Sequence, residues 1–145
     1  MTWRVSKNLR RINNMCLRSK SNRYLVAEYD IPCYKVLDNY GVNKYRTPII
    51  GALITDDVLD GTRLMVASGD EHIHEEAYED WGIGRYCIGV GFIHSYADLS
   101  LSKKMTYGLD YRVVFACEIP KGERYFVSSN GTQYASKSLG FVKEC

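Results

Sequence analysis

The sequence predicts an α+β domain: a mostly antiparallel sheet of short strands with one or two helices, preceded by a basic N-terminal arm. Runs of Tyr, Val, Ile and Leu recur along the chain and alternate with Gly, Pro, Asn and Asp turn signals. One segment has helical patterning with capping residues. The 145 residues, 46% hydrophobic and 25% charged, have an ordinary globular composition and suffice for one buried core.

Extended segments, each bounded by turn residues, are expected in the first half of the chain at 24–30, 31–37, 44–54 and 63–68. Pro32 forbids a continuous helix across the first pair, and Pro48 breaks the third segment or places it at a sheet edge. Residues 56–61 (DDVLDG) are expected to form a polar turn. Residues 70–80 (DEHIHEEAYED), with six acids, are expected to form an exposed loop or a short helix.

Further strands are expected in the second half at 86–93, 111–119, 123–128 and 139–143. Gly89 and Gly91 mark a bulge or a close approach of two backbones. A helix is expected over 96–107, because Ser95 is a suitable N-cap, Asp98 follows three residues later and two lysines lie near the end.

The charge distribution is uneven. Residues 1–23 contain no acid, and the other 122 residues hold 12 basic and 17 acidic groups. A basic arm (1–23) followed by one domain (24–145) is therefore expected. The arm would dock on an acidic protein surface or contact nucleic acid, and the alternative is a solvated terminus. The basic residues of the arm are Arg4, Lys7, Arg10, Arg11, Arg18, Lys20 and Arg23.

The five cysteines are odd in number and form no CxxC pair. Free thiols in a reducing compartment are expected, with Cys33, Cys87 and Cys117 as small buried hydrophobes. No apolar run is long enough to span a membrane, and no signal peptide is expected. The expected location is the cytoplasm of a host cell or a virion.

Three histidines could carry chemistry. His72 and His74 stand among carboxylates but lack the spacing of a tetrahedral metal set, so a solvated acidic segment is preferred and no metal is predicted. His94 lies at an expected strand-to-helix junction, where it would meet a ligand or serve a structural role. Twelve tyrosines leave base stacking open. The chain has no GxSxG elbow and no phosphate loop.

Four motifs occur in a characteristic order: CYKVL (33–37), GFIHSY (91–96), CEIPKG (117–122) and YASK (134–137). This order resembles a group of small proteins of gut Bacteroidota and their phages, including crAss-like phages, over about residues 30–142. The resemblance implies a phage-encoded protein.

The same order is similar, more distantly, to the ADP-ribosyltransferase-like fold. This resemblance places Lys35 at the basic position of the first strand and His94 and Ser95 at the junction facing the nicotinamide ribose. It places 133–138, with Ser136, near the catalytic loop. The chain has Lys35 where that fold has Arg or His, and 133–136 contain no glutamate, although NAD cleavage needs a carboxylate.

The favoured interpretation is a non-enzymatic phage-type binding or assembly protein, with no cofactor and no catalytic residue assigned. The arm would dock on a virion or another large partner. Two alternatives stay open: an ADP-ribosyltransferase-like enzyme using NAD, and a counter-defence protein that sequesters a nucleotide signal. The expected ligand-binding residues are Tyr34, Lys35, His94, Ser95, Tyr96 and Ser136.

Overall fold

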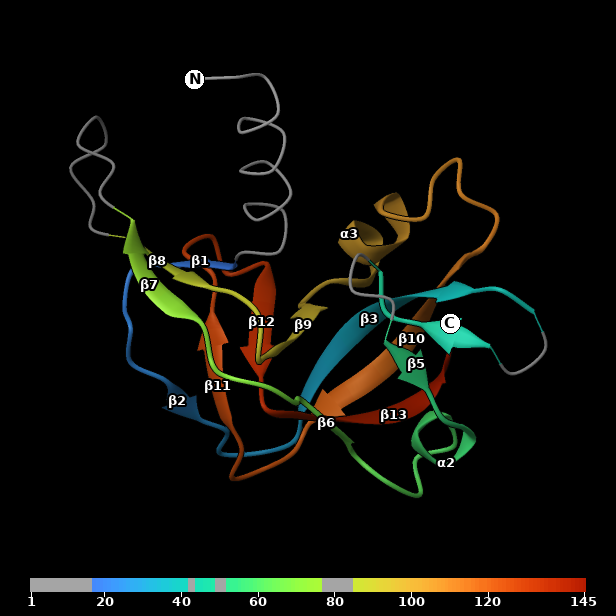
Figure 1. Ribbon diagram of the computed structural model, residues 1–145, viewed down its shortest axis with the longest axis horizontal. Coiled ribbons are helices and arrows are strands. Elements are labelled where there is room, and N and C mark those ends of the chain that lie inside the picture. The colour runs from blue at the N-terminus through green and yellow to red at the C-terminus, as the bar shows by residue number, and fades with distance from the viewer. Residues whose placement is uncertain (1–16, 42–43, 49–51, 77–84) are drawn as a thin grey trace.

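The computed structural model describes residues 17–41, 44–48, 52–76 and 85–145. Their elements are, in chain order, β1 Leu17–Ser19, β2 Leu25–Val26, β3 Ile31–Asn39, β4 Tyr45–Arg46, β5 Leu53–Ile54, α2 Asp56–Leu59, β6 Met65–Val66, β7 Ile73–Glu76, β8 Arg85–Ile88, β9 Ile93–Tyr96, α3 Leu99–Lys104, β10 Arg112–Ile119, β11 Arg124–Val127, β12 Gln133–Ser136 and β13 Ser138–Glu144. Strands dominate and the helices are short, which confirms the predicted α+β class (Figure 1).

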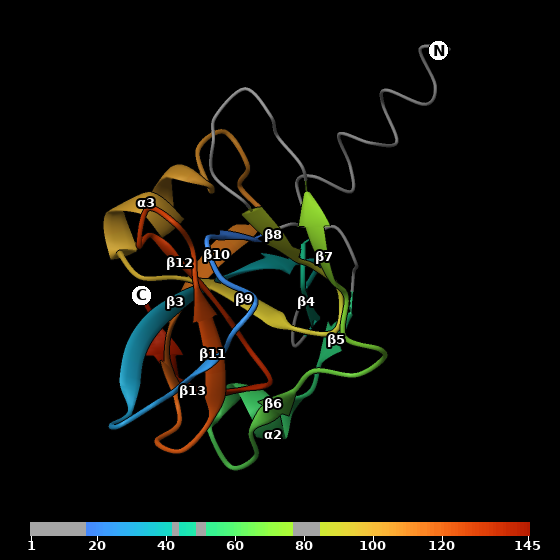
Figure 2. The same cartoon turned by 90° about the vertical axis from the view of Figure 1, so that its left-hand side faces the viewer.

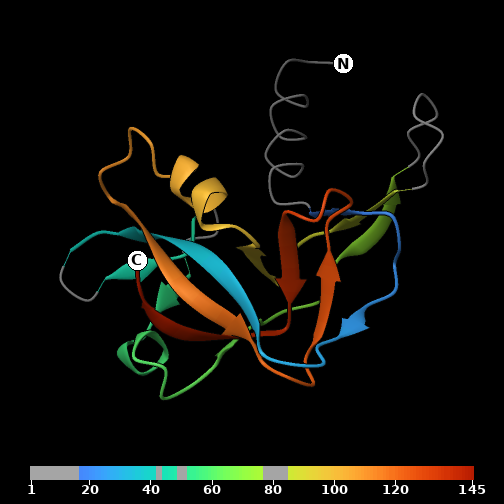
Figure 3. The same cartoon turned by 180° about the vertical axis from the view of Figure 1, so that it is seen from behind.

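Every strand pair among these residues is antiparallel. The larger sheet has the order β2-β11-β12-β9-β3-β10-β13-β6, and β4 pairs with β3 and with β5. A small sheet has the order β1-β8-β7. Seen from behind, β3 and β10 are long neighbouring strands, with α3 close to them (Figure 3).

The core follows from strand alternation on β3 and β10. Ile31, Cys33 and Leu37 share one face of β3, and their partners across the ladder, Ile119, Cys117 and Val113, extend that face onto β10. Leu139 and Phe141 of β13 and Val58 of α2 complete the cluster. Burial of this aliphatic face is the main stabilising contribution to the larger sheet.

A second cluster joins the small sheet to the end of the larger one. Leu17 of β1, Ile88 of β8, Phe126 of β11 and Ala135 of β12 are all nearly inaccessible to solvent. β1 contacts both β11 and β12, and β8, its partner in the small sheet, lies beside it in Figure 2. Because Leu17 and Ser19 are buried in this sheet, residues 17–19 belong to the folded body and not to the predicted arm. Residues 1–16 lie outside the described residues.

Two segments of the first half differ from expectation. Residues 56–59 form a helix instead of a turn: Asp56 and Asp57 favour its first turn, and Val58 gains a buried position. The acidic segment contains β7 instead of a loop or helix, because β8 supplies a partner that pairs His74 with Cys87. Residues 77–80 of that segment lie outside the described residues.

The predicted N-cap at Ser95 is wrong. Pairing of β9 with β12 continues to Tyr96, opposite Gln133, so Ser95 is still within a strand. Asp98 caps α3 instead, and its carboxylate accepts a hydrogen bond from the Ser100 amide at 3.1 Å. The helix is therefore shorter than predicted and starts later.

The expectation of free thiols holds for Cys33, Cys117 and Cys145. It is wrong for Cys87, which is disulfide-bonded. No helix of the described residues has the length and apolar character needed to cross a membrane.

Candidate functional site

The candidate site lies where β3 and β9 separate. The two strands pair at a single position, Tyr34 with Tyr96. The Asn39 amide donates a hydrogen bond to the Tyr111 carbonyl, on the side of β3 that faces β10. Main-chain groups alternate in direction along a strand, so the odd-numbered residues of β3 direct theirs toward β10 and the even-numbered residues direct theirs toward β9. The Ala97 amide donates to Thr132, which places the main-chain groups of His94 on the side of β3.

Val36 and His94 would therefore form the next hydrogen-bonded pair, but no pairing of β3 with β9 extends to them in the described residues. Farther along, β3 pairs with β4 at Asp38 and Asn39. Within the described part of the chain, the split leaves the main chain of Val36 without a strand partner on that side. This gap in the ladder is the structural origin of the site.

A cavity of about 690 Å³ occupies the split. Lys35 and Val36 line one wall and residues 89–96 another, while residues 47–48, 52–55 and 63–68 close it from across. The described lining is mostly aliphatic and includes no Asp or Glu. Several large apolar side chains at the cavity are between 43% and 67% exposed: Leu53, Leu64, Val66 and Val90.

Lys35 bridges the split. Its ammonium donates a hydrogen bond of 2.7 Å to the carbonyl of His94, 59 residues away in the chain. Burial lowers the pKa of Lys35 to about 8. No carboxylate among the described residues lies within ion-pair distance of it. Arg63, the other cation of the lining, is paired with Asp57 at 2.8 Å.

The His94 ring is held in one protonation state. Its Nε2 lies 3.0 Å from the Gly89 carbonyl oxygen, which can only accept, so Nε2 carries the proton and Nδ1 is the acceptor. Burial lowers the pKa of His94 to about 4, and the charge of Lys35 acts in the same direction. At neutral pH the ring is therefore uncharged and positions the turn before β9.

His94 is expected to make the protein sensitive to acid. Between pH 6.5 and 4 the unfolded chain binds a proton at this residue while the folded chain does not, so stability falls as pH falls through that window. The loss is about 3 kcal/mol, since each pKa unit corresponds to roughly 1.4 kcal/mol. Urea unfolding at pH 7 and pH 4 measures it, and His94→Gln removes this contribution. An unchanged pH dependence in His94→Gln, with exposed His72→Gln as control, would contradict the assignment.

Four of the six predicted ligand-binding residues line the cavity: Lys35, His94, Ser95 and Tyr96. Tyr34 lines a shallow depression near α3 instead. Ser136 is fully buried and donates to the Ser138 carbonyl at 2.9 Å, so it does not reach the cavity. Gln133, at the start of the same expected segment 133–138, does line the cavity.

Ser95 has an unusual environment. Its side chain is 2% exposed and lies beside the Cys33 thiol, yet its hydroxyl has no hydrogen-bond partner among the described residues. Burial of Cys33 raises the pKa of its thiol to about 11, and the neighbouring Ser95 side chain acts in the opposite direction. Ser95 thus belongs to the cavity lining, but solvent does not reach its hydroxyl.

The wall formed by residues 47–48, 52–55 and 63–68 was not predicted from the sequence. The available signal was weak: Leu53, Leu64 and Val66 are apolar residues in short segments between polar turns, a pattern that strands with a buried face also produce. They can be identified as a cavity wall only from the structure, in which all three side chains are exposed and lie beside the split.

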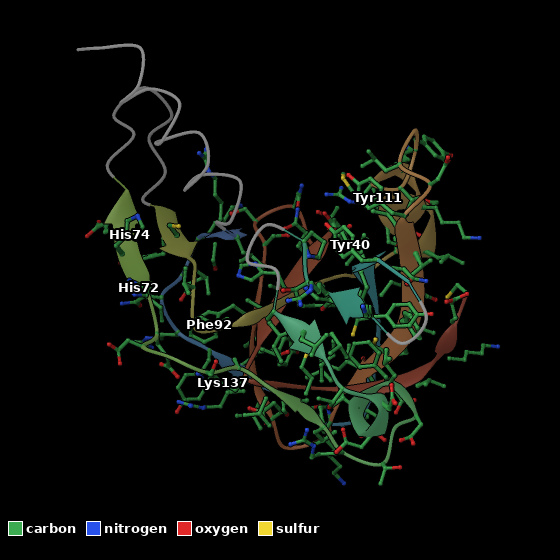
Figure 4. All side chains as sticks on the ribbon, turned by 45° about the vertical axis from the view of Figure 1, so that its right-hand side comes forward. Tyr40, His72, His74, Phe92, Tyr111 and Lys137 are labelled. Carbon is green, nitrogen blue, oxygen red and sulfur yellow. The ribbon has the colours of Figure 1, made fainter. Side chains whose placement is uncertain are left out.

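Lys137 holds residues 70–71, here called the strap, against Gly91 in the cavity wall. Its ammonium donates to the Gly91 carbonyl at 2.7 Å, lies 3.4 Å from a Glu71 carboxylate oxygen and sits 5.2 Å from the centre of the Phe92 ring. Figure 4 shows Lys137 and Phe92 side by side. Arg124 contacts the same carboxylate at 3.5 Å. The segment around Glu71 is therefore held against the turn that precedes β9.

The histidine-rich acidic segment forms no cation site in the part of the chain that the structure describes, where no three His, Cys, Asp or Glu side chains gather as metal ligands would. His74 lies on β7 and His72 directly precedes this strand (Figure 4). Of the predicted arm residues, Arg18, Lys20 and Arg23 lie within the described residues. Arg4, Lys7, Arg10 and Arg11 lie outside them.

Comparison of this chain with protein-family models, with curated proteins and with solved structures finds no match. The candidate function therefore depends on the geometry of the split and on the chemistry of its walls.

Proposed function

We propose that the chain is a non-enzymatic binding protein that holds a small, largely apolar ligand in the split between β3 and β9. The observation that supports this proposal is the cavity of about 690 Å³, which is bordered by exposed aliphatic side chains. Ligand cavities are typically concave, apolar and equipped with a few polar groups. Covering these side chains with a ligand would remove apolar surface from water, at roughly 25 cal/mol per Å².

The other functions raised by the sequence receive less support. An acid-free lining gives no support to NAD cleavage, which needs a carboxylate near the ribose. The tyrosines provide little for a stacked base, since Tyr96 alone among them lines the cavity as described. Docking of the basic arm, a phage origin and a place in a virion stay predictions, because most of the arm lies outside the described residues.

The proposal predicts saturable binding of a neutral apolar reporter, N-phenyl-1-naphthylamine, measured by its fluorescence. Ser68→Trp, which adds bulk to an exposed lining residue, is expected to weaken binding by about tenfold or more, equivalent to about 1.4 kcal/mol. Ser129→Trp makes the same change at an exposed position away from the cavity and is the matched control. Absence of saturable binding, or equal weakening by both variants, would reject the proposal.

A further inference from the structure

We infer that the polar end of this cavity is a carboxylate site, and that the ligand is an aliphatic monocarboxylate whose headgroup contacts Lys35 and the unpaired main chain of the split. The inference rests on the proposed function and adds the chemical class of the ligand. Three kinds of observation carry it: the charge balance of the cavity, the main-chain donors at the split and the composition of the walls.

Among the described lining residues, Lys35 is the one cation that has no negatively charged partner. Asp57 neutralises Arg63, and His94 is uncharged at neutral pH. Lys35 has a carbonyl acceptor and no carboxylate. A partly buried ammonium loses hydration and is stabilised when an anion comes within contact distance. Its own carbonyl contact occupies one of three N–H donors, and the other two have no partner among the described residues.

Main-chain donors converge on the same place. Val36 and His94 both direct their amides into the separation of β3 and β9, where the ladder that would have paired them is interrupted. Lys35 is adjacent to Val36 in sequence, and its ammonium lies on the carbonyl of His94. An acceptor with two oxygens could take hydrogen bonds from the ammonium and from an amide of the split, as carboxylates commonly do.

The residues of the cavity walls favour a ligand that has a single negative charge and an aliphatic chain. Beyond Lys35 the cavity is bordered by residues such as Leu53, Leu64 and Val66, which suit an alkyl chain. A dianionic phosphate would bring a second negative charge for which the described lining has no unpaired cation. The geometry therefore favours a carboxylate over a phosphate.

The titratable groups that face Lys35 permit a clean pH test. They are Cys33 on its own strand, Cys117 on β10 and His94 on β9. Burial raises the pKa of Cys33 to about 11 and that of Cys117 further, whereas the pKa of His94 falls to about 4. Between pH 6 and 10, Lys35 is thus the group of this set that titrates. Carboxylate affinity should decline as pH rises above 8, since the neutral amine no longer attracts an anion.

The test compares decanoate, decanol and decyl phosphate by calorimetry at pH 7. Decanoate is expected to bind at least tenfold more tightly than decanol. In Lys35→Met this preference should disappear while decanol binding persists, and Lys104→Met, an exposed lysine on α3, should behave as wild type. The preference should also diminish between pH 8 and 10 in the wild type.

The outcomes separate the two levels of the argument. Equal binding of decanoate and decanol, or a preference that survives Lys35→Met, would overturn the carboxylate site and leave the apolar cavity standing. Tighter binding of decyl phosphate than decanoate would overturn it in favour of a phosphate headgroup. Failure of all three compounds together with failure of the neutral reporter would overturn the proposed function itself.

Discussion

Replacing Arg112 with Met is expected to destabilise the protein by about 3–5 kcal/mol, because it leaves a buried carboxylate without its partner. Asp38, 8% exposed at its side chain, accepts from Arg112 Nε at 2.9 Å, and the two residues lie opposite each other on β3 and β10. Arg112 also donates to the Met105 carbonyl at 3.1 Å, which ties the end of α3 to this strand. The loss would therefore loosen both the sheet and the helix beside it.

Urea unfolding at pH 7 measures this effect as a shift in the free energy of unfolding. The double variant Asp38→Asn/Arg112→Met should recover much of the lost stability, since it removes the stranded charge as well. Lys143→Met, an exposed cation on β13, is expected to change stability by less than about 0.5 kcal/mol. A loss below about 1 kcal/mol in Arg112→Met would show that Asp38 finds solvent or another donor.

Gly91→Ala is expected to cost about 2–4 kcal/mol, the second large effect. Gly91 has a φ of +92°, and a Cβ there would lie 2.8 Å from the Glu71 Cα and also clash with the Asp70 backbone. Neither neighbour is a flexible side chain, so the strap would have to move away from the turn before β9. Because Gly91 lines the cavity, weaker reporter binding should accompany the loss of stability.

Gly131→Ala provides the matched comparison. Gly131 has a φ of +74°, but a Cβ there would meet nothing within 4 Å. Its expected cost is about 1 kcal/mol, from backbone conformation alone. Thermal unfolding of both variants separates the cost of backbone strain from the cost of a steric clash. Equal losses of stability in Gly91→Ala and Gly131→Ala would show that no close backbone contact exists at Gly91.

Local patterns predicted most of the extended segments. The run around Pro32 became β3, the VVFACEI run became most of β10, and the turn at Gly122 falls between β10 and β11 as expected. These predictions succeeded because β-branched and aromatic residues bounded by Gly and Pro favour strands whatever they pair with. The predictions around α2 and β7 failed because partners remote in sequence decided them.

Only part of the site could be found in the same way. Lys35 and His94 were recognised as candidates from their places in strand-like segments, yet nothing local indicates that the lysine ammonium reaches the histidine carbonyl. The burial of Leu17 was also beyond sequence reasoning, because it depends on β1 lying beside β8.

Residue patterns along the chain were sufficient to predict the class of the fold, the approximate location of most strands and the acid-free, basic N-terminal segment. Tertiary structure alone decided that β3 and β9 meet at Tyr34 and Tyr96 and then separate. The physical reason is that strand propensity is a property of neighbours along the chain, whereas a ladder is made, or interrupted, between residues about 60 positions apart. A cavity that arises from such an interruption therefore has no signature in the local sequence pattern.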